Sequence, residues 1–415
     1  MQRLPVVAAD RLLYAMEPLA INEIHLVVDF DAAPDPVPLA EALRRLLDLE
    51  PILGCRLVTG FWGAHWERLP AAALDDFALE IGGNEASFLA RRRDPRAGPQ
   101  LEARLVGERL ILKVSHLAGD AGAVKALGYR LAALVRGEDD GQVREGDRGA
   151  FQVLHLLHPR HWGAHLRTAA RELWALGWPP KSAGLLTGAV PDEQFEVRTL
   201  HLDAPRVAAC RALAEAHGAT LNDLVAAALL RALARVAAPG LPLRLLDTVD
   251  LRRYISDVGS LPTCNQSSFF GIAPGEVGPD LPTALTRTRS WTAALKEGRP
   301  GAWYLLTWGP LLRGLPFGLG VPLLRGYMLR QAARGANPPI FTNMGRIDER
   351  RLEFGSLTVG TAWMIVPLFR PPGVGCGISG FRDSLTLTQG FSGGPAVAAK
   401  VDAWLRAFLE EIEGA

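Results

Sequence analysis

The sequence predicts an α+β protein built from two halves of similar design. Strand-like and helix-like segments are mixed along its 415 residues without the strict alternation that marks a parallel βαβ fold. A charged, glycine-containing stretch at 137–149 separates the halves. A chain of this length is expected to form two domains. We therefore predict an N-terminal unit at 1–150, a crossover at 151–190 and a C-terminal unit at 191–415.

The first half shows both periodicities of regular structure. Alternation of apolar and polar residues is typical of strands, and spacings of three and four are typical of helices. Gly107-Glu108 separates two strand-like runs and predicts a hairpin. Strands are expected at 23–31, 55–58, 63–67, 101–106 and 109–115, and helices at 37–49, 86–93 and from Asp120 to about 137. We expect 137–149 to be a surface loop or linker, followed by an amphipathic crossover helix at about 159–176.

The second half opens with a new strand and repeats the mixture. Thr220 with Asp223 three residues later is typical of a capping box at a helix start. Strands are expected at 194–202, 243–249, 340–344, 356–365, 375–381 and 384–389, and helices at 205–217, from Thr220, and at 280–296, 322–333 and 394–413.

Composition favours a soluble cytoplasmic enzyme. The formal net charge is +1, which does not indicate a nucleic-acid partner. The four cysteines are far apart and form no metal-binding or disulfide spacing. The N-terminus lacks a signal-peptide pattern. We expect no transmembrane segment, because no stretch offers the roughly 20 uninterrupted apolar residues that a span requires.

The stretch 303–329 is unusually apolar, although Arg313 and Arg325 interrupt it. One interpretation is a core or interdomain helix pair. The alternatives are an apolar wall for a long acyl chain and a membrane-surface contact. This stretch favours a hydrophobic substrate together with the tryptophans Trp162, Trp174, Trp178, Trp303 and Trp308, although aromatic residues usually fill cores.

The most informative segment is Ser115-His116-Leu117-Ala118-Gly119-Asp120-Ala121-Gly122, where the period changes from strand to helix. An imidazole titrates near neutral pH, so His116 could take a proton from a hydroxyl or amine and return it. The small residues allow substrate atoms to approach the backbone. The alternative is an ordinary turn in which Asp120 is the helix N-cap and His116 a half-buried polar residue.

This segment resembles the His-x-x-x-Asp-Gly signature of the condensation-domain and CoA-dependent acyltransferase superfamily, which includes chloramphenicol-acetyltransferase-like and polyketide-associated enzymes. Further segments resemble this superfamily in the expected order. They are Ala42 to Leu53 (first helix and the turn after it), His217 to Leu224 ("gaTvNDv"), Val249 to Tyr254 ("vdlR") and Thr342 to Gly345 ("sNlG"). The resemblance implies two chloramphenicol-acetyltransferase-like subdomains in a V, with a tunnel between them and the histidine at its middle.

The resemblance also implies residue roles. His116 would be the general base, and Asp120 would point away from the site and pair with Arg252, with Arg253 as the rival partner. The residues expected to bind substrate are Ser115, Gly119, Ala121, Gly122 and Asn343. Candidate oxyanion donors are Thr248, Ser267, Asn343 and Ser384, although each could be a structural hydrogen-bonding residue.

Two positions depart from the family pattern. Ser115 stands where many relatives have a first histidine, and Ala121 stands where a glycine usually follows the aspartate. Because alanine does not adopt positive φ easily, we expect a slightly reshaped loop or a narrowed entrance for the acceptor.

A histidine cluster suggests a different chemistry. His155, His158, His161 and His165 lie close together, and the last two have the i, i+4 spacing of a helical metal site. Pro159 interrupts this register and no carboxylate lies among them, which favours a solvated crossover and no metal.

Three functions remain open from the sequence. The first is an acyltransferase that moves an acyl group from a CoA or carrier-protein thioester to a hydroxyl, or less readily an amine, with no bound cofactor. The second is a non-catalytic condensation-like protein that docks a carrier protein or another partner. The third is a metal-dependent hydrolase built on the histidine cluster.

Overall fold

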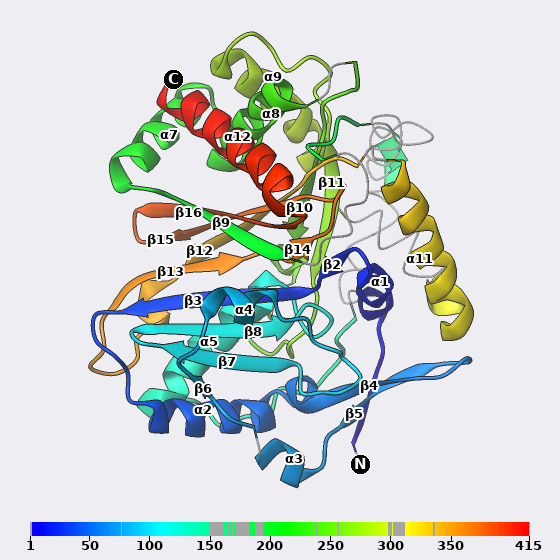
Figure 1. Cartoon of the computed structure of the whole chain (residues 1–415), viewed down its shortest axis with the longest axis vertical. Coiled ribbons are helices and arrows are strands. Elements are labelled where there is room, and N and C mark those ends of the chain that lie inside the picture. Colours follow the sequence, from blue (N-terminus) through cyan, green and yellow to red (C-terminus); the bar gives the residue numbers. More distant parts are fainter. Residues whose placement is uncertain are drawn as a thin grey trace.

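The computed structural model describes residues 2–75, 77–149, 162–163, 166–167, 170, 182–186, 194–237, 240–255, 257–297, 301, 312–334 and 337–414. Figure 1 shows the described elements as two halves, one above the other, each built on its own sheet.

The first half carries the N-terminal strands and helices. Its strands are β1 (Arg3–Pro5), β2 (Ala20–Ile21), β3 (Glu23–Phe30), β4 (Cys55–Thr59), β5 (Ala64–Arg68), β6 (Glu80–Ile81), β7 (Leu101–Val106) and β8 (Arg109–Ser115). Its helices are α1 (Ala8–Met16), α2 (Pro36–Leu49), α3 (Ala71–Asp75), α4 (Glu85–Ala90) and α5 (Ala121–Arg136), with a 3-10 turn η1 (Pro51–Gly54).

The second half follows the same mixed pattern. Its strands are β9 (Phe195–Leu202), β10 (Leu245–Asp250), β11 (Ser267–Ile272), β12 (Ile340–Ile347), β13 (Val359–Ile365), β14 (Leu368–Phe369), β15 (Gly375–Phe381) and β16 (Ser384–Ser392). Its helices are α7 (Ala204–Ala216), α8 (Leu221–Val236), α9 (Leu281–Glu297), α11 (Phe317–Ala333) and α12 (Gly394–Glu413), with 3-10 turns η4 (Leu251–Tyr254) and η5 (Glu349–Arg351).

The two halves exchange strands. The five-stranded sheet has the order β13-β3-β8-β7-β6, so β13 from the second half lies antiparallel to β3. The eight-stranded sheet has the order β11-β10-β12-β15-β16-β14-β2, with β9 also paired to β16, so β2 from the first half lies at its edge. A third sheet has the order β1-β5-β4. This exchange fastens the halves beside the end of β8, where the His116 segment begins.

Apolar burial explains why the elements pack in this way. One core lies between the five-stranded sheet and helices α2 and α5, and it includes Leu26, Leu43 and Leu127. A second core lies between the eight-stranded sheet and helices α8, α9 and α12, and it includes Leu229 and Trp404. Figure 1 shows α8, α9 and α12 over the upper sheet. The α+β class predicted from the sequence is confirmed.

Helix ends follow the local signals in the sequence. The Thr220 hydroxyl and the Asp223 carboxylate form the predicted capping box at the start of α8. Asp120 caps α5 by accepting a hydrogen bond from the backbone N–H of Ala123. The same helix ends at Gly137, whose φ of 71° lies in the left-handed region that favours glycine.

The stretch 137–149 has no regular secondary structure and most of its residues are exposed, as predicted for a surface loop, but some of its charged side chains are buried. Arg148 is 2% exposed, and Arg130 of α5 holds Asp139 through an ion pair of 2.9 Å. The charged composition of this stretch predicted exposure to solvent, because charges rarely lie inside a fold without partners. These buried charges do have buried partners.

The apolar stretch before β12 is described from residue 312 onward. The inner face of α11 packs on α1, burying Phe317, Val321 and Leu324 with Ala15. This face fits the interpretation as a core helix, whereas other apolar side chains of α11 are exposed. Within the described ranges, no helix is long and apolar enough to cross a membrane.

Candidate active site

The candidate site is the turn that joins β8 to α5. The backbone N–H of His116 donates to the carbonyl of Asn22 at 2.8 Å, and the N–H of Ala118 donates to the carbonyl of Ser115 at 2.9 Å. Because β8 is an inner strand of its sheet, these bonds hold the imidazole at the end of a fixed element. The His116 side chain is half-buried.

Asn265, which precedes β11 in the second half, holds the His116 ring. Its Oδ1 lies 3.1 Å from His116 Nδ1. Its Nδ2 lies 2.8 Å from the carbonyl oxygen of His116 and 3.4 Å from that of Leu117. An amide N–H must face those two carbonyls, so the amide oxygen must face the ring. Nδ1 therefore carries the proton, and Nε2 carries the lone pair.

The electrostatic environment keeps this imidazole neutral. Burial lowers the pKa of His116 below its usual value of 6.5, because desolvation disfavours the charged ring. The charge of Asp120 and hydrogen bonds from the ring to acceptors, including Asn265, oppose this shift without reversing it. The ring is thus available as a proton acceptor at neutral pH.

Asp120 joins the two halves behind the imidazole. Its Oδ2 accepts hydrogen bonds from Arg252 Nη1 at 3.0 Å, from the Gln266 backbone N–H at 2.7 Å and from the Ser267 hydroxyl at 3.0 Å. Its Oδ1 accepts the bond from Ala123 N–H at 3.0 Å. All of these donors point at a carboxylate that is 1% exposed.

The ion pair between Asp120 and Arg252 that the resemblance implies is present. Burial alone would raise the pKa of Asp120, but the charge of Arg252 and the hydrogen bonds around the carboxylate outweigh it and lower the pKa. Arg252 also donates to the carbonyl of Cys264 at 2.9 Å. The rival partner, Arg253, is exposed and lies over the ring of Tyr254.

Two glycines allow these close approaches. A Cβ on Gly122 would lie 2.7 Å from Arg252 Nη1. A Cβ on Gly119 would lie 2.8 Å from the Ala123 Cβ and 3.0 Å from a methyl group of Thr263. Ala121 is the first residue of α5 and is not among the described non-glycine residues with positive φ. The expectation that this alanine reshapes the loop through its φ angle is therefore wrong.

Arg148 braces the turn from the other side. Its Nη2 donates to the carbonyls of Leu117 and Ala118 at 3.1 and 3.2 Å, and its Nη1 pairs with Asp10 at 3.1 Å. Trp66 Nε1 also donates to Asp10, at 2.8 Å. The carbonyls of residues 116–118 are thus held by Asn265 and Arg148, which the sequence analysis did not single out.

Other predicted site residues lie outside this cluster of contacts. Ser115 is buried and lines a small cavity with Glu23. Asn343 is exposed, donates to Asn222 at 3.0 Å and accepts from the Gly345 N–H at 2.9 Å. The oxyanion candidate Thr248 contacts Thr342 through its hydroxyl at 2.6 Å.

The last two oxyanion candidates have structural partners. Ser267 donates to Asp120, and the Ser384 hydroxyl donates to the carbonyl of Phe381 across the β15–β16 turn at 2.8 Å. These bonds match the alternative interpretation of both as structural hydrogen-bonding residues. Their role toward an oxyanion stays a prediction.

Two cavities flank the turn. The one beside Ser115 has a volume of about 10 Å³, which is room for one water molecule. Burial raises the pKa of Glu23, which lines it, to about 7. A groove of about 350 Å³ lies beside Gly122, and its lining includes Lys125, Arg346 and Arg351 together with Asp250.

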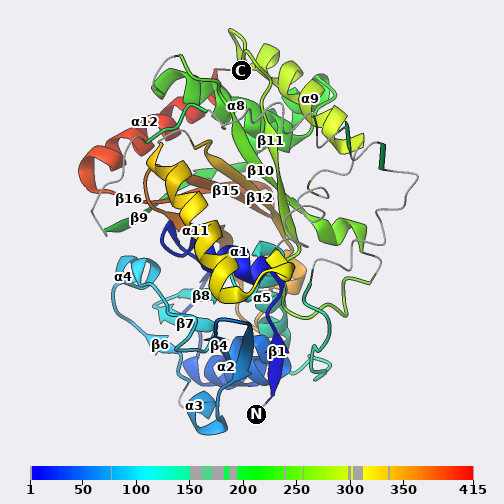
Figure 2. The same ribbon diagram turned by 90° about the vertical axis from the view of Figure 1, so that its right-hand side faces the viewer.

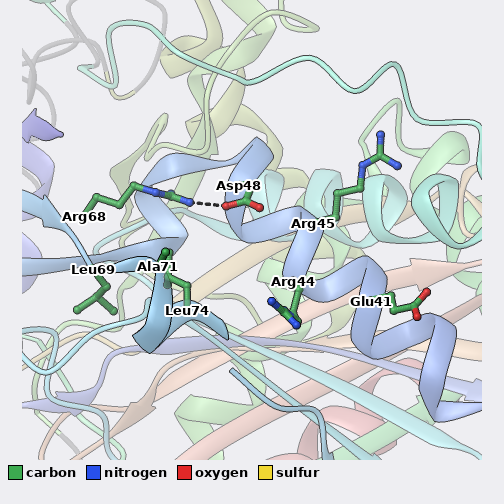
Figure 3. Close-up of a pocket in the computed structure, with 8 residues that line it drawn as sticks. All are labelled: Glu41, Arg44, Arg45, Asp48, Arg68, Leu69, Ala71 and Leu74. Carbon is green, nitrogen blue, oxygen red and sulfur yellow. Dashed lines mark hydrogen bonds and ion pairs between the residues drawn. The ribbon is translucent and has the colours of Figure 1, made fainter. Parts of the chain in front are cut away.

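A further groove, of about 450 Å³, lies on the outer side of α2 and shares no residue with the turn. In Figure 3 Arg68 points toward Asp48, to which it is paired at 2.7 Å, whereas Arg44 and Arg45 extend on different sides of the helix. Because none of its lining residues belongs to the His116 turn, this groove is not part of the candidate active site.

The predicted histidine cluster of His155, His158, His161 and His165 lies outside the described residues. Among those that are described, no group of three or more histidine, cysteine or acidic side chains is arranged to hold a metal ion.

Comparisons with known proteins agree with this architecture. Residues 191–274 match the family described as phthiocerol/phthiodiolone dimycocerosyl transferase C-terminus. Among curated proteins, none matches the sequence significantly.

Solved structures match almost the whole chain. Polyketide synthase associated protein 5 from Mycobacterium tuberculosis is 17% identical and covers 99% of this chain and 98% of its own, with a TM-score of 0.64. A trichothecene 15-O-acetyltransferase from Fusarium sporotrichioides is 13% identical, covers 99% and 94%, and has a TM-score of 0.71. The first condensation domain of the calcium-dependent antibiotic synthetase is 18% identical, covers 99% and 97%, and has a TM-score of 0.69.

These matches confirm the resemblance drawn from the motifs at the level of the fold. The chain has the two-subdomain fold of condensation domains and chloramphenicol-acetyltransferase-like acyltransferases. The V shape and the tunnel stay predictions.

Proposed function

We propose that the protein is an acyltransferase that moves an acyl group from a thioester to a hydroxyl group. The observation that carries this proposal is the hydrogen bond between His116 Nδ1 and Asn265, which leaves Nε2 as the basic nitrogen on a turn held from both halves. A non-catalytic protein has no need of an imidazole fixed in this tautomer. The fold shared with acyltransferases supports the same assignment.

In the proposed reaction, His116 Nε2 accepts the proton of the acceptor hydroxyl while its oxygen attacks the thioester carbonyl. A tetrahedral intermediate forms and collapses as the carbon–sulfur bond breaks. The imidazolium then returns its proton to the departing sulfur, so the products are an ester and a free thiol. No bound cofactor is needed for these steps.

Asn265 and Asp120 act as positioning residues in this proposal. Asn265 fixes the tautomer and the orientation of the ring, as a partner of the second ring nitrogen does in other histidine sites. Asp120 accepts no bond from the imidazole in the described contacts and instead ties α5 to Arg252 and to the start of β11. It therefore differs from the orienting carboxylate of a Ser-His-Asp triad.

The name of one similar protein supports an ester as the product. It is a 15-O-acetyltransferase, and transfer to oxygen is what that name specifies. We propose an acyl-CoA or a phosphopantetheinyl carrier thioester as the donor. Cations and carboxylates both line the groove beside Gly122, and among them Lys125, Arg346 and Arg351 suit the phosphate groups that both donors carry.

The proposal is tested by thiol release from acyl-CoAs of increasing chain length, with and without a mixed pool of alcohols and amines. We expect release that requires both an acceptor and His116. His116→Ala removes the base, and the half-buried His217, which caps the C-terminal end of α7, provides the matched His217→Ala control.

Release that is unchanged in His116→Ala would contradict the role of the imidazole. If no CoA thioester reacts, the same assay with acyl-loaded carrier proteins tests the second donor class. Inactivity with both donors, together with carrier-protein binding, would favour the alternative of a non-catalytic docking protein.

A further inference from the structure

An apolar surface outside the candidate active site is formed by α11 and by the tip of the β4–β5 hairpin. Trp62 at the hairpin tip is 81% exposed, and Leu323 in the middle of α11 is 59% exposed. The exposed apolar side chains of this α11–hairpin surface are Phe61, Trp62, Leu319, Leu323, Tyr327 and Leu329. Large exposed apolar groups that gather on one face are typical of an interaction site.

This surface is a fixed part of the fold. The backbone N–H of Gly318 donates to the carbonyl of Phe61 at 2.7 Å, and a Cβ on Gly318 would lie 2.8 Å from the Phe61 ring. The hairpin tip therefore contacts the first turn of α11, as Figure 1 also shows. The inner face of the helix is anchored on α1 through Phe317 and Leu324.

The outer face of α11 points away from the molecule. Leu319 and Leu323 are four residues apart and Tyr327 is four further on, so they follow one stripe of the helix. Buried residues such as Val321 and Leu324 occupy the opposite stripe. Figure 2 shows α11 in yellow in front of α1, on the face of the molecule turned to the viewer.

The sequence on both sides of α11 carries charges of one sign. From residue 298 to residue 347 the sequence contains no aspartate or glutamate, whereas arginines recur. Arg330 and Arg334 are exposed at the C-terminal end of α11, directly after the apolar stripe. An apolar face with tryptophan and leucine, followed by exposed arginines at the end of the helix, is the pattern of a helix that lies in the interface of an anionic membrane.

We propose that the α11–hairpin surface docks the protein on an anionic lipid bilayer. Trp62, Leu319 and Leu323 insert at the level of the headgroups and acyl chains, while Arg330 and Arg334 contact the lipid phosphates. This proposal does not depend on acyl transfer, because the residues on which it rests are exposed and take no part in the His116 turn.

The test is co-sedimentation of the full chain with lipid vesicles. We expect binding to vesicles of phosphatidylcholine mixed with phosphatidylglycerol and much weaker binding to phosphatidylcholine alone. A cation near such a surface strengthens binding by about fivefold, so Arg330→Gln combined with Arg334→Gln should weaken it by about 25-fold. Leu323→Glu should abolish binding.

The matched control is Ile81→Glu. Ile81 is 69% exposed on β6 and lies outside the α11–hairpin surface, so its replacement should leave vesicle binding unchanged. The circular dichroism spectrum and the thermal unfolding of Leu323→Glu, compared with those of the wild type, report whether the fold is retained, and this readout does not depend on the proposed function.

Three results would overturn the proposal. The first is wild-type protein that does not sediment with the mixed vesicles. The second is wild-type protein that elutes as a dimer in size-exclusion chromatography and becomes a monomer in Leu323→Glu, because a second copy of the chain would then cover the surface. The third is binding of a phosphopantetheinylated carrier protein that Leu323→Glu abolishes while vesicles do not bind.

Discussion

Replacing Asp120 by asparagine tests whether this carboxylate is a structural link between the halves. Asparagine keeps one oxygen for the Ala123 N–H but presents an NH₂ group where Oδ2 now accepts three hydrogen bonds, those from Arg252, Gln266 and Ser267. Breaking a buried ion pair by removing one partner costs about 3–5 kcal/mol. We expect Asp120→Asn to lower the free energy of unfolding by that amount.

Urea denaturation followed by circular dichroism measures this loss. The matched control is Asp250→Asn, because Asp250 also pairs with Arg252, at 3.2 Å, but its side chain is 52% exposed. An exposed pair contributes at most about 1 kcal/mol. The reasoning is refuted if Asp120→Asn loses less free energy of unfolding than Asp250→Asn does. It is also refuted if Asp120→Asn folds normally and retains full activity.

The pH dependence of this loss has a definite sign. The native pKa of Asp120 is lowered, so its contribution to stability is fully present above the unfolded value of about 3.9. It disappears as the pH falls through the native pKa, because the wild-type carboxyl then becomes neutral as well. The stability difference between wild type and Asp120→Asn should therefore be constant near neutrality and shrink in acid.

Three further predictions concern the same turn. Asn265→Leu should lower kcat by about 10- to 100-fold with little change in KM, and ¹⁵N NMR of His116 should show loss of the single tautomer; an unchanged tautomer would contradict the role of the amide. Because the pKa of His116 is lowered from 6.5, kcat/KM should stay constant from neutral pH down to a midpoint below 6.5, and a midpoint above it would count against the buried site. Gly122→Ala places a Cβ 2.7 Å from Arg252 and should cost about 1–3 kcal/mol of stability, whereas Gly63→Ala, with nothing within 4 Å, should be nearly neutral.

Much of the fold could be predicted from the sequence because its elements have strong periodicity. The predicted β7–β8 hairpin, β15 and α12 have the bounds that the structure shows. These elements each bury one clear apolar stripe or lie between two other strands, so the pattern of side chains reflects their surroundings directly. Short strands such as β2 and β14 carry too few residues to show a period.

The missed strand β11 follows polar residues that are buried. The strand β11 begins after Cys264-Asn265-Gln266, and Asn265 and Gln266 are both buried. A polar run before a strand normally predicts a loop, because polar groups usually face water. Here these groups are buried because they hydrogen-bond across the junction between the halves, and the sequence of one half does not show what the other half offers.

The same reason explains why the site could be predicted only in part. His116, Asp120 and Arg252 carry a family motif, so a resemblance of local sequence was enough to pair them. Asn265 and Arg148 belong to no such motif. They lie 149 and 32 positions after His116 and reach the turn only through tertiary contacts. Their role is visible only in the fold, where both are buried and hydrogen-bond to carbonyls of the turn.

The bracing of the turn also connects the proposed catalytic role of His116 with the association of the halves. From the second half, Asn265 holds the His116 ring while Arg252 and Ser267 hold Asp120. A small separation of the halves would break these bonds together, because Asn265, Gln266 and Ser267 are consecutive residues. The ring would then lose its fixed tautomer before either core was exposed. Substitutions at the junction should therefore lower kcat under conditions in which both halves are still folded, and the geometry of the imidazole is a property of the assembled pair and not of the first half alone.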